Sequence, residues 1–276
     1  MSGDRKTAVL TGATGGIGAE VARAFAARGD RLILAGRDQG KLDAVLAALS
    51  GDGHASVRAD LSLVSENRRA AAAIMEAAPC VDLLLNVAGA IIGDRHETAE
   101  GNEMTLAVNL LGPIALSHAL LPALRAAPAP RVVMTGSEAI AFVRDLAPGD
   151  IQSTRRYRGF PGAYARAKAW LTVWALSRPL GDVPVLIADP GGTKTDMTTL
   201  PALPLPIRLL RPFIMHGPDV AARAFVKAGA ELPLAQAEGR IVTPKKIVVP
   251  KAKFTDPATI EAVREAVEAR LMKGAA

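Results

Sequence analysis

The chain has 276 residues, and half of them are hydrophobic, so one large apolar core is expected and bulk disorder is excluded. A single cysteine, Cys80, excludes a disulfide framework, and no apolar run reaches the roughly 18 residues that a membrane-spanning helix needs. The formal net charge is +6, but tight basic clusters occur only at 155–158 and 245–246, and aromatic residues make up 4% of the chain. We therefore expect no nucleic-acid partner.

The start of the chain carries no targeting pattern. Its first six residues are polar, and the apolar run that follows is too short for the core of a signal peptide. A lone cysteine is compatible with a reducing compartment. These features predict a cytoplasmic protein that does not contact a membrane.

Short apolar runs alternate with helical patterns along the whole chain. Continuous apolar runs are typical of parallel strands covered on both faces, and the alternation predicts right-handed crossovers. The expected fold class is therefore α/β: one doubly wound parallel sheet of about seven strands with helices on both faces, formed by a single domain over 1–276. Strands are predicted at 5–11, 31–35, 55–59, 81–86, 131–136, 183–188 and 240–243, and helices at 16–28, 38–49, 62–77, 98–126 and 163–180.

A glycine-rich stretch, Thr11–Gly18, lies where the first predicted strand ends and the first predicted helix begins. Glycine lets the backbone reach positive φ and lets a phosphate approach closely, and the helix that follows offers unpaired N–H groups to an anion. We therefore predict the pyrophosphate-binding turn of a dinucleotide-binding (Rossmann) domain. The predicted cofactor contacts in this turn come from Gly12, Thr14, Gly15, Gly16, Ile17 and Gly18.

Two further strand ends carry residues suited to the adenosine half of a dinucleotide. Arg37 follows the second strand, where a cation suits the 2′-phosphate of NADP and an acid would suit NAD. We therefore predict NADP rather than NAD. The alternative is that Arg37 caps the strand end or pairs with Asp38, itself the expected N-cap of the next helix. Asp60 and Leu61 follow the third strand, and Asp60 is expected either to bind the adenine amino group or to cap the helix near Ser62.

The ends of the fourth and fifth strands carry small and polar residues. Asn86, Ala88 and Gly89 end the fourth strand, where small residues allow a ligand to approach the backbone, although a plain loop is the alternative. Ser137 ends the fifth strand, at the edge where open α/β sheets bind ligands. Asn109 interrupts an apolar helical run, so its amide needs a hydrogen-bond partner, structural or catalytic.

Tyr164 and Lys168 are four residues apart in a predicted helix and therefore share one of its faces. A cation near a phenol favours the phenolate, so Lys168 is expected to lower the pKa of Tyr164 from its reference value of about 10. A phenol of lowered pKa suits acid–base catalysis near neutral pH. The same spacing is also common among surface pairs.

Together these motifs resemble the short-chain dehydrogenase/reductase family over most of the chain. Thr11–Gly18 matches the family's glycine turn, and Asn-Val-Ala-Gly at 86–89 is similar to its Asn-Asn-Ala-Gly segment. The segment 190–195 resembles the Pro-Gly-x-x-x-Thr segment after the sixth strand, in which Thr195 would contact the nicotinamide carboxamide. The catalytic tetrad of the family is matched, in order, by Asn109, Ser137, Tyr164 and Lys168. The resemblance implies cofactor contacts from Pro190, Gly191, Thr193 and Thr195, and from Tyr164 and Lys168.

The resemblance implies a role for each member of this tetrad. Tyr164 would exchange a proton with the substrate oxygen, and Lys168 would lower its pKa and hold the nicotinamide ribose. Ser137 would hydrogen-bond the reacting oxygen, and Asn109 would hold a water that links the lysine to solvent. The implied protein is an NADP-dependent oxidoreductase, a carbonyl reductase that interconverts a carbonyl and an alcohol by hydride transfer. A non-catalytic NADP-sensing protein and a reductase of carbon–carbon double bonds are the alternatives.

Within the family, the chain looks like the retinol-dehydrogenase and protochlorophyllide-reductase-like group. Arg37, the segment Gly101–Gly112 and the long gap before Tyr164 suggest this group. Two residues depart from the expected pattern. Val87 replaces the second Asn of the Asn-Asn-Ala-Gly segment, and Glu138 stands where the group often has a small residue, so its part in substrate binding is left open.

The last third of the chain contains a predicted lid and a predicted terminal helix. A segment of about 196–218 is rich in proline and leucine and occupies the place of the family's substrate lid. An apolar lid implies an apolar or aromatic small-molecule substrate; a packed loop, or a surface that contacts a membrane or a partner chain, is the alternative. The segment of about 256–273 predicts an amphipathic helix against the core or a neighbouring subunit, so a homodimer or homotetramer is left open. The four histidines show no metal-ligand spacing, and no metal site is predicted.

Overall fold

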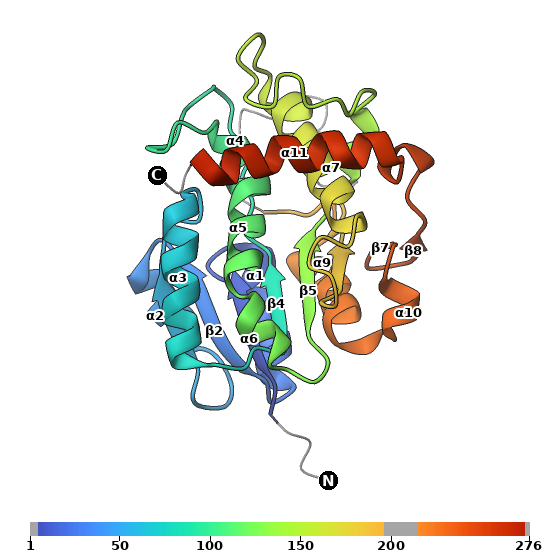
Figure 1. The fold of residues 1–276 in the computed structure, drawn as a ribbon. Coiled ribbons are helices and arrows are strands. Elements are labelled where there is room, and N and C mark those ends of the chain that lie inside the picture. The colour runs from blue at the N-terminus through green and yellow to red at the C-terminus, as the bar shows by residue number, and fades with distance from the viewer. Residues whose placement is uncertain (1–4, 196–214, 274–276) are drawn as a thin grey trace.

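The computed structural model describes residues 5–195 and 215–273 (Figure 1), so 1–4, 196–214 and 274–276 lie outside the described residues. The predicted lid of about 196–218 therefore lies outside them too, apart from 215–218.

The described residues form one eight-stranded sheet. Its strands are β1 (Thr7–Thr11), β2 (Arg31–Gly36), β3 (Ala55–Arg58), β4 (Leu83–Asn86), β5 (Arg131–Thr135), β6 (Val185–Ala188), β7 (Ile241–Val242) and β8 (Ile247–Val248). In space they follow the order β3-β2-β1-β4-β5-β6-β7-β8, with every pair parallel except β7 with β8. The order reverses between β1 and β4, and open α/β sheets bind ligands beyond the carboxyl ends of their strands at such a reversal.

Helices cover both faces of this sheet (Figure 1). The longer ones are α1 (Gly16–Ala27), α2 (Gln39–Ala47), α3 (Val64–Ala77), α5 (Gly112–Ala119), α7 (Tyr164–Leu176), α9 (Pro218–Val226) and α11 (Pro257–Lys273). The shorter ones are α4 (Met104–Leu106), η1 (Ala107–Leu111), α6 (Leu121–Arg125), η2 (Glu138–Phe142), η3 (Gly159–Ala163), η5 (Lys227–Glu231), α10 (Leu234–Ala237) and η6 (Ala252–Phe254).

The alternation of side chains along the strands divides the core into two layers. In β1, Val9 belongs to the layer under α3, α5 and α7, whereas Ala8 and Leu10 belong to the layer under α1 and α9. Since both faces are covered, most of the strands are apolar on both faces, as the sequence predicted, and the edge strand β3 is the exception. Each Val or Leu that is fully buried contributes about 1.5–3 kcal/mol to folding. Helix α11 crosses in front of α7 in Figure 1 and adds Val263 and Val267 to the first layer.

The predicted fold class is confirmed, with a difference at the sheet edge. The sheet has eight strands rather than about seven, because β8 returns against β7 as the second arm of a hairpin. Each arm has only two residues, which is too short for a side-chain alternation to be recognised in the sequence.

The predicted helix 98–126 begins later than expected, at Met104. The carboxylate of Glu103 accepts hydrogen bonds from the N–H groups of Thr105 (2.6 Å) and Leu106 (2.8 Å), and thereby caps the helix at this point. The helix then widens into the π-helical turn η1, which contains Asn109. Such turns are rare and occur frequently at functional sites.

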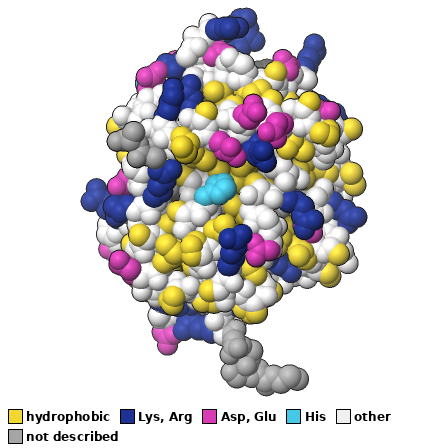
Figure 2. Space-filling view, viewed as in Figure 1, with side chains coloured by type: hydrophobic (Ala, Val, Ile, Leu, Met, Phe, Trp, Pro, Cys, Tyr) yellow, Lys and Arg dark blue, Asp and Glu magenta, His cyan; other side chains and the backbone are white. Residues whose placement is uncertain are grey.

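The surface mixes charges of both signs. Figure 2 shows Lys and Arg side chains spread over this face between acidic and apolar ones. On the face drawn in Figure 2, the Lys and Arg side chains therefore do not gather into a single basic patch. Among the described residues, no helix is both long and apolar enough to span a membrane.

Candidate active site

A cleft of about 590 Å³ lies beyond the carboxyl ends of β1, β2 and β4, at the reversal of the strand order; we call it the nucleotide half of the site. The glycine turn forms one wall, where α1 begins at Gly16. The N-cap residue of α1 is Gly15, which has no side chain with which to cap the helix, and the first turn of α1 contains no acid. The first N–H groups of α1 therefore face the cleft without a capping side chain, which suits an anion.

Two glycines of this turn are required by close backbone approach. Gly12 has a φ of +74°, and a Cβ there would lie 2.8 Å from the backbone of Ala88. A Cβ on Gly18 would lie 2.0 Å from the carbonyl oxygen of Gly12. The turn therefore folds back tightly on itself and against the end of β4, and a side chain at either position would open it.

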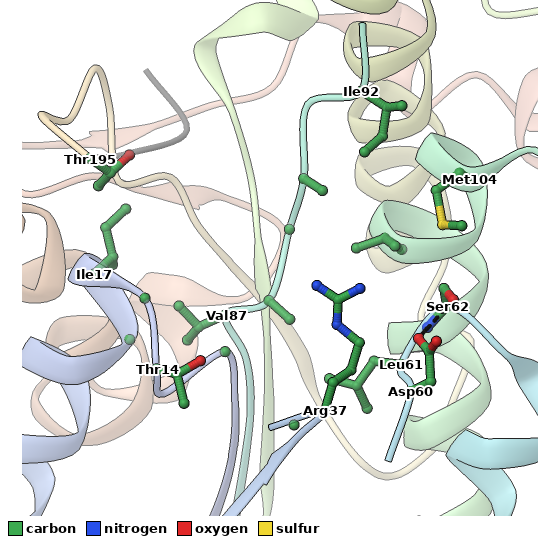
Figure 3. Close-up of a pocket in the computed structure, with 18 of the residues that line it drawn as sticks. Thr14, Ile17, Arg37, Asp60, Leu61, Ser62, Val87, Ile92, Met104 and Thr195 are labelled. Atoms are coloured by element: carbon green, nitrogen blue, oxygen red, sulfur yellow. Dashed lines mark hydrogen bonds between the residues drawn. The ribbon is translucent and has the colours of Figure 1, made fainter. Parts of the chain in front are cut away.

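The far end of the nucleotide half is lined by Arg37, Asp60 and Leu61, and Figure 3 shows the guanidinium of Arg37 extending into the cleft. Asp38 does not hold this guanidinium. Its carboxylate accepts a hydrogen bond from the N–H of Lys41 (3.1 Å), so it caps α2 as predicted. Arg37 is exposed to solvent within the cleft, in a position to meet an anion.

Asp60 stabilises a turn before α3 rather than the helix itself. Its carboxylate accepts hydrogen bonds from the N–H (3.0 Å) and the hydroxyl (2.7 Å) of Ser62. The first N–H groups of α3, on Val64 and Ser65, instead donate to the carboxylate of Glu100 at 2.7 and 2.9 Å. The Asp60 side chain therefore lines the cleft, but its Oδ1 is already hydrogen-bonded to Ser62.

A second cavity of about 420 Å³, which we call the reaction half, continues from the first. The two share Ile17, Val87, Gly89 and Thr195 in their walls, so they form one continuous site. Three of the predicted catalytic residues line the reaction half together: Ser137, Tyr164 and Lys168. The predicted cofactor residues Pro190, Gly191 and Thr193 line it as well.

Burial dominates the chemistry of Tyr164. The ring is 9% exposed, and burial raises the pKa of its hydroxyl to about 12, with the negative charge of Asp189 acting in the same direction. Hydrogen bonding with Ser137 lowers this pKa, but only in part. The pKa of Tyr164 is therefore not lowered as the sequence predicted. The Lys168 ammonium lies 5.9 Å from the ring centroid and donates instead to the carbonyl oxygen of Thr135 (3.1 Å).

Lys168 and Asp189 are buried charges of opposite sign in the same cavity. Burial lowers the pKa of Lys168 to about 8, and the nearby Asp189 carboxylate partly offsets this. Burial raises the pKa of Asp189 to about 6, helped by the charge of Glu138, while a hydrogen bond from the N–H of Gly191 (2.8 Å) and the charge of Lys168 lower it. Around neutral pH the lysine is therefore mainly an ammonium and the aspartate mainly a carboxylate.

Asn109 lies behind the cavity wall with its amide fully engaged. Its Nδ2 donates to the carbonyl oxygens of Ala90 (2.8 Å) and Thr105 (2.9 Å), and its Oδ1 accepts from the N–H of Ala90 (3.3 Å). The side chain therefore joins the π-helical turn to the loop after β4. The partners that the sequence predicts for this amide are thus backbone groups, and the catalytic part that the resemblance implies for Asn109 stays a prediction.

Asn86 is the one predicted cofactor residue that the structure directs away from the site. Its Nδ2 donates to Ser117 Oγ (3.3 Å) and Met134 Sδ (3.4 Å), inside the first core layer. The side chain points away because the alternation along β4 directs it to that face. Apart from Asn86 and Asn109, every predicted site residue lines one of the two halves.

Several lining residues are not predicted from the sequence, because they come from segments that are far apart in the chain and carry no recognisable motif. In the nucleotide half these are Ile92, His96, Met104 and Val108. In the reaction half they include Ile91, Ala139, Phe142, Phe160, Asp189, Met215 and Phe225. For Asp189 the sequence does carry a signal, since an acid directly after β6 must lie at the carboxyl edge of the sheet.

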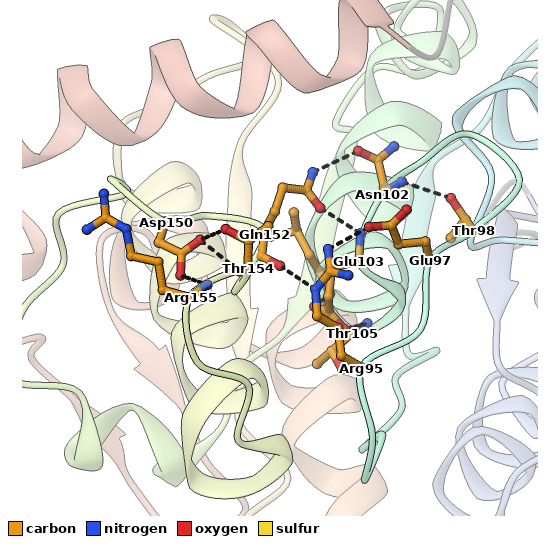
Figure 4. Close-up of polar contacts among 11 residues, drawn as sticks. Arg95, Glu97, Thr98, Asn102, Glu103, Thr105, Asp150, Gln152, Thr154 and Arg155 are labelled. Atoms are coloured by element: carbon orange, nitrogen blue, oxygen red, sulfur yellow. Dashed lines mark hydrogen bonds and ion pairs between the residues drawn. The ribbon is translucent and has the colours of Figure 1, made fainter.

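A buried polar network joins the loop before α7 to the segment before α4 (Figure 4). Gln152 is its centre: its Oε1 accepts from the N–H of Glu103 (2.7 Å), and its Nε2 donates to Asn102 Oδ1 (3.1 Å). The Arg95 Nε donates to the carbonyl oxygen of Gln152 (3.2 Å). The long segment between Ser137 and Tyr164 is thus anchored to the cap of α4.

The chain is similar to known proteins in both sequence and structure. A family model described as short chain dehydrogenase matches residues 6–144. Polyprenol dehydrogenase of Mus musculus is 34% identical over 206 residues, covering 70% of this chain and 61% of the relative. Retinol dehydrogenase 12 of Homo sapiens is 31% identical over 234 residues, covering 82% of this chain and 74% of the relative. The match to polyprenol dehydrogenase thus spans less than two thirds of that protein.

Solved structures share the fold over most of the chain. An uncharacterised protein from Mycobacterium paratuberculosis has a TM-score of 0.75 and 26% identity, covering 97% of this chain and 93% of that one. A short chain dehydrogenase from Burkholderia cenocepacia in complex with NADP has a TM-score of 0.63 and 26% identity, covering 86% of this chain and 95% of that one.

Proposed function

Because the chain belongs to the short-chain dehydrogenase family, we propose that it is an NADP-dependent enzyme that interconverts a carbonyl and an alcohol on an apolar or aromatic small molecule. It is an oxidoreductase, and its relatives include retinol dehydrogenases, the group that the sequence resembles. The observation that carries the proposal is the meeting of Ser137, Tyr164 and Lys168 in a cavity that opens into the glycine-lined cleft.

The nucleotide half suits a dinucleotide. The uncapped start of α1 offers N–H groups to a pyrophosphate, and the tight turn at Gly12 and Gly18 leaves the backbone open to it. Arg37 supports NADP over NAD because it offers a cation, not an acid, at the end of β2. The Burkholderia relative in complex with NADP is consistent with this choice. The cofactor supplies the hydride when bound, and the chain supplies orientation and the proton.

Tyr164 is proposed as the proton donor and acceptor. With a pKa of about 12 in the free protein, its hydroxyl carries a proton at neutral pH that it can donate to a carbonyl oxygen. Ser137 lies beside it and is proposed to donate a hydrogen bond to the same oxygen as negative charge develops. Lys168 is proposed to hold the nicotinamide ribose with the ammonium that Thr135 now orients.

The test is NADPH consumption against a panel of apolar aldehydes, ketones and enones. The proposal expects oxidation of NADPH with an aldehyde or ketone and formation of the alcohol. Saturated ketones formed from enones would identify a reductase of carbon–carbon double bonds instead. Tight NADPH binding without turnover of any compound would favour the NADP-sensing alternative. The single domain over 1–276, the cytoplasmic location and a homodimer or homotetramer stay predictions of the sequence.

A further inference from the structure

The reaction half has an aromatic wall that ends at the proposed proton donor. The rings of Phe142 and Phe160 meet edge to face with centroids 5.9 Å apart, and those of Phe160 and Tyr164 lie 6.0 Å apart at 41°. Phe142 is 58% exposed, which is unusual for so large an apolar side chain. The row therefore runs from the surface into the cavity and offers ring faces and edges to a flat or cationic group.

The charge of this cavity is opposite to that of the chain. Its charged lining residues, among those that the structure describes, are Glu138, Lys168 and Asp189: two acids and one base. Lys168 is the base, and its ammonium already donates to the carbonyl oxygen of Thr135. The chain as a whole has a net charge of +6, so this local excess of negative charge stands out.

Only one of the two carboxylate oxygens of Asp189 accepts a hydrogen bond within the described residues. The residue is 5% exposed, and its Oδ1 accepts the N–H of Gly191 at 2.8 Å. Within 5–195 and 215–273, its Oδ2 accepts no hydrogen bond and is not one of the fully enclosed polar atoms, so it is open to the cavity. Glu138 raises the pKa of Asp189, which means that the two negative charges act on one another across this wall. A positive group in the cavity would bind the open oxygen of Asp189 and relieve the repulsion between the two carboxylates.

These features determine where each part of a ligand fits. A carbonyl oxygen belongs at Ser137 and Tyr164, and an aromatic ring belongs against Phe160. Glu138 follows Ser137 directly in the chain, lines the cavity and is exposed, so its negative charge lies near a ligand held at Ser137. An aromatic ring that carries a positive charge would satisfy the aromatic wall and the acids together.

Resting on the function proposed above, we infer that the preferred substrates are aromatic aldehydes or ketones that also carry a cationic group, and that Glu138 is the residue that selects for this charge. The Asp189 carboxylate adds negative charge from the buried side of the cavity. It also acts on Tyr164 and Lys168, so Glu138 is the cleaner residue to test.

The test compares two substrates of the same shape. One is para-(trimethylammoniomethyl)benzaldehyde, and the other is para-neopentylbenzaldehyde, in which carbon replaces the cationic nitrogen. The wild-type protein should use the cation with a kcat/KM higher by about fivefold or more and with a lower KM, because the charge contributes to binding. The cationic group also withdraws electrons from the carbonyl, but this effect is the same in every variant, so comparing variants isolates the contribution to binding. Added salt should reduce this preference.

Glu138→Gln keeps the shape of the side chain and removes its charge. It should lower the ratio of kcat/KM for the cation to kcat/KM for the neutral aldehyde by about fivefold. Glu265→Gln is the matched control, since Glu265 is exposed on α11 and lies outside the cavity. It should leave the preference unchanged.

Three results would overturn the inference. A wild-type protein that uses both aldehydes equally, or prefers the neutral one, has no cation subsite. A preference that survives Glu138→Gln does not come from Glu138. A change in the relative affinities for NADP⁺ and NADPH in that variant, with the substrate preference intact, would assign Glu138 to the charge of the nicotinamide ring. Turnover of the neutral aldehyde in these cases leaves the proposed function standing, whereas turnover of no aldehyde or ketone overturns both.

Discussion

The two halves of the site differ in the groups that form their walls. The nucleotide half is built around a backbone turn, in which Gly12 and Gly18 lie at contact distances that admit no side chain, and Arg37 adds a cation at its far end. The reaction half is made of large and charged side chains, among them Phe160, Tyr164 and Asp189. Backbone geometry of this kind binds a ligand common to many proteins. Side chains that meet from several segments determine which substrate a particular chain accepts.

The sharpest contrast between the halves is expected from Tyr164→Phe. The substitution removes the proton that reduction requires, so kcat should fall by about a thousandfold, within the range typical for acid–base groups. NADPH affinity should stay within about twofold, because most of the proposed cofactor contacts lie in the other half. Single-turnover kinetics and NADPH fluorescence titration measure the two quantities. Comparable losses in both would contradict the division of the site.

The opposite pattern is expected from Gly18→Ala. The added Cβ would lie 2.0 Å from the carbonyl oxygen of Gly12, so the backbone must move and the pyrophosphate seat with it. NADPH affinity should fall by roughly a hundredfold, because losing one or two hydrogen bonds to a charged phosphate costs about 3 kcal/mol. Gly149→Ala is the control, since a Cβ there meets nothing within 4 Å. Unchanged NADPH binding by Gly18→Ala would show that the turn does not hold the cofactor.

Arg37→Ala tests the cation of the nucleotide half. Removing the guanidinium should lower the preference for NADPH over NADH by about tenfold, because only NADPH carries the 2′-phosphate. Rates with NADH should change little. Arg58→Ala, which removes an exposed cation at the end of β3 outside the cleft, should leave the preference as it is. A preference that survives Arg37→Ala would place the 2′-phosphate elsewhere.

The sequence predicts the nucleotide half better than the reaction half. The features of the nucleotide half depend on residues close together in the sequence, whereas those of the reaction half depend on residues far apart in it. The glycine turn and Asp38, the cap of α2, each act within a few residues, so their roles follow from local pattern. The aromatic wall joins Phe142 and Phe160 to Tyr164, and its composition depends on how separate segments fold together.

Long-range contacts also explain where local interpretation falls short. Asp60 has the local appearance of a helix cap, yet Glu100 caps α3 from more than thirty residues away. Asn86 belongs to a recognisable motif, but the alternation along β4 turns its side chain into the core. Tyr164 and Lys168 have the right spacing, while the effect of burial on the pKa of each depends on the whole fold.

The last and smallest effect concerns pH. Burial lowers the pKa of Lys168 to about 8, so the ammonium is lost at a lower pH than in water, whereas Tyr164, with a pKa of about 12, stays protonated. Carbonyl reduction should therefore decline a few-fold as the pH rises through 8, and the decline reports the lysine rather than the tyrosine. Lys168→Arg should be slower overall but flat over this range, because a guanidinium keeps its proton. A decline that persists in Lys168→Arg would assign the titration to another group of the reaction half.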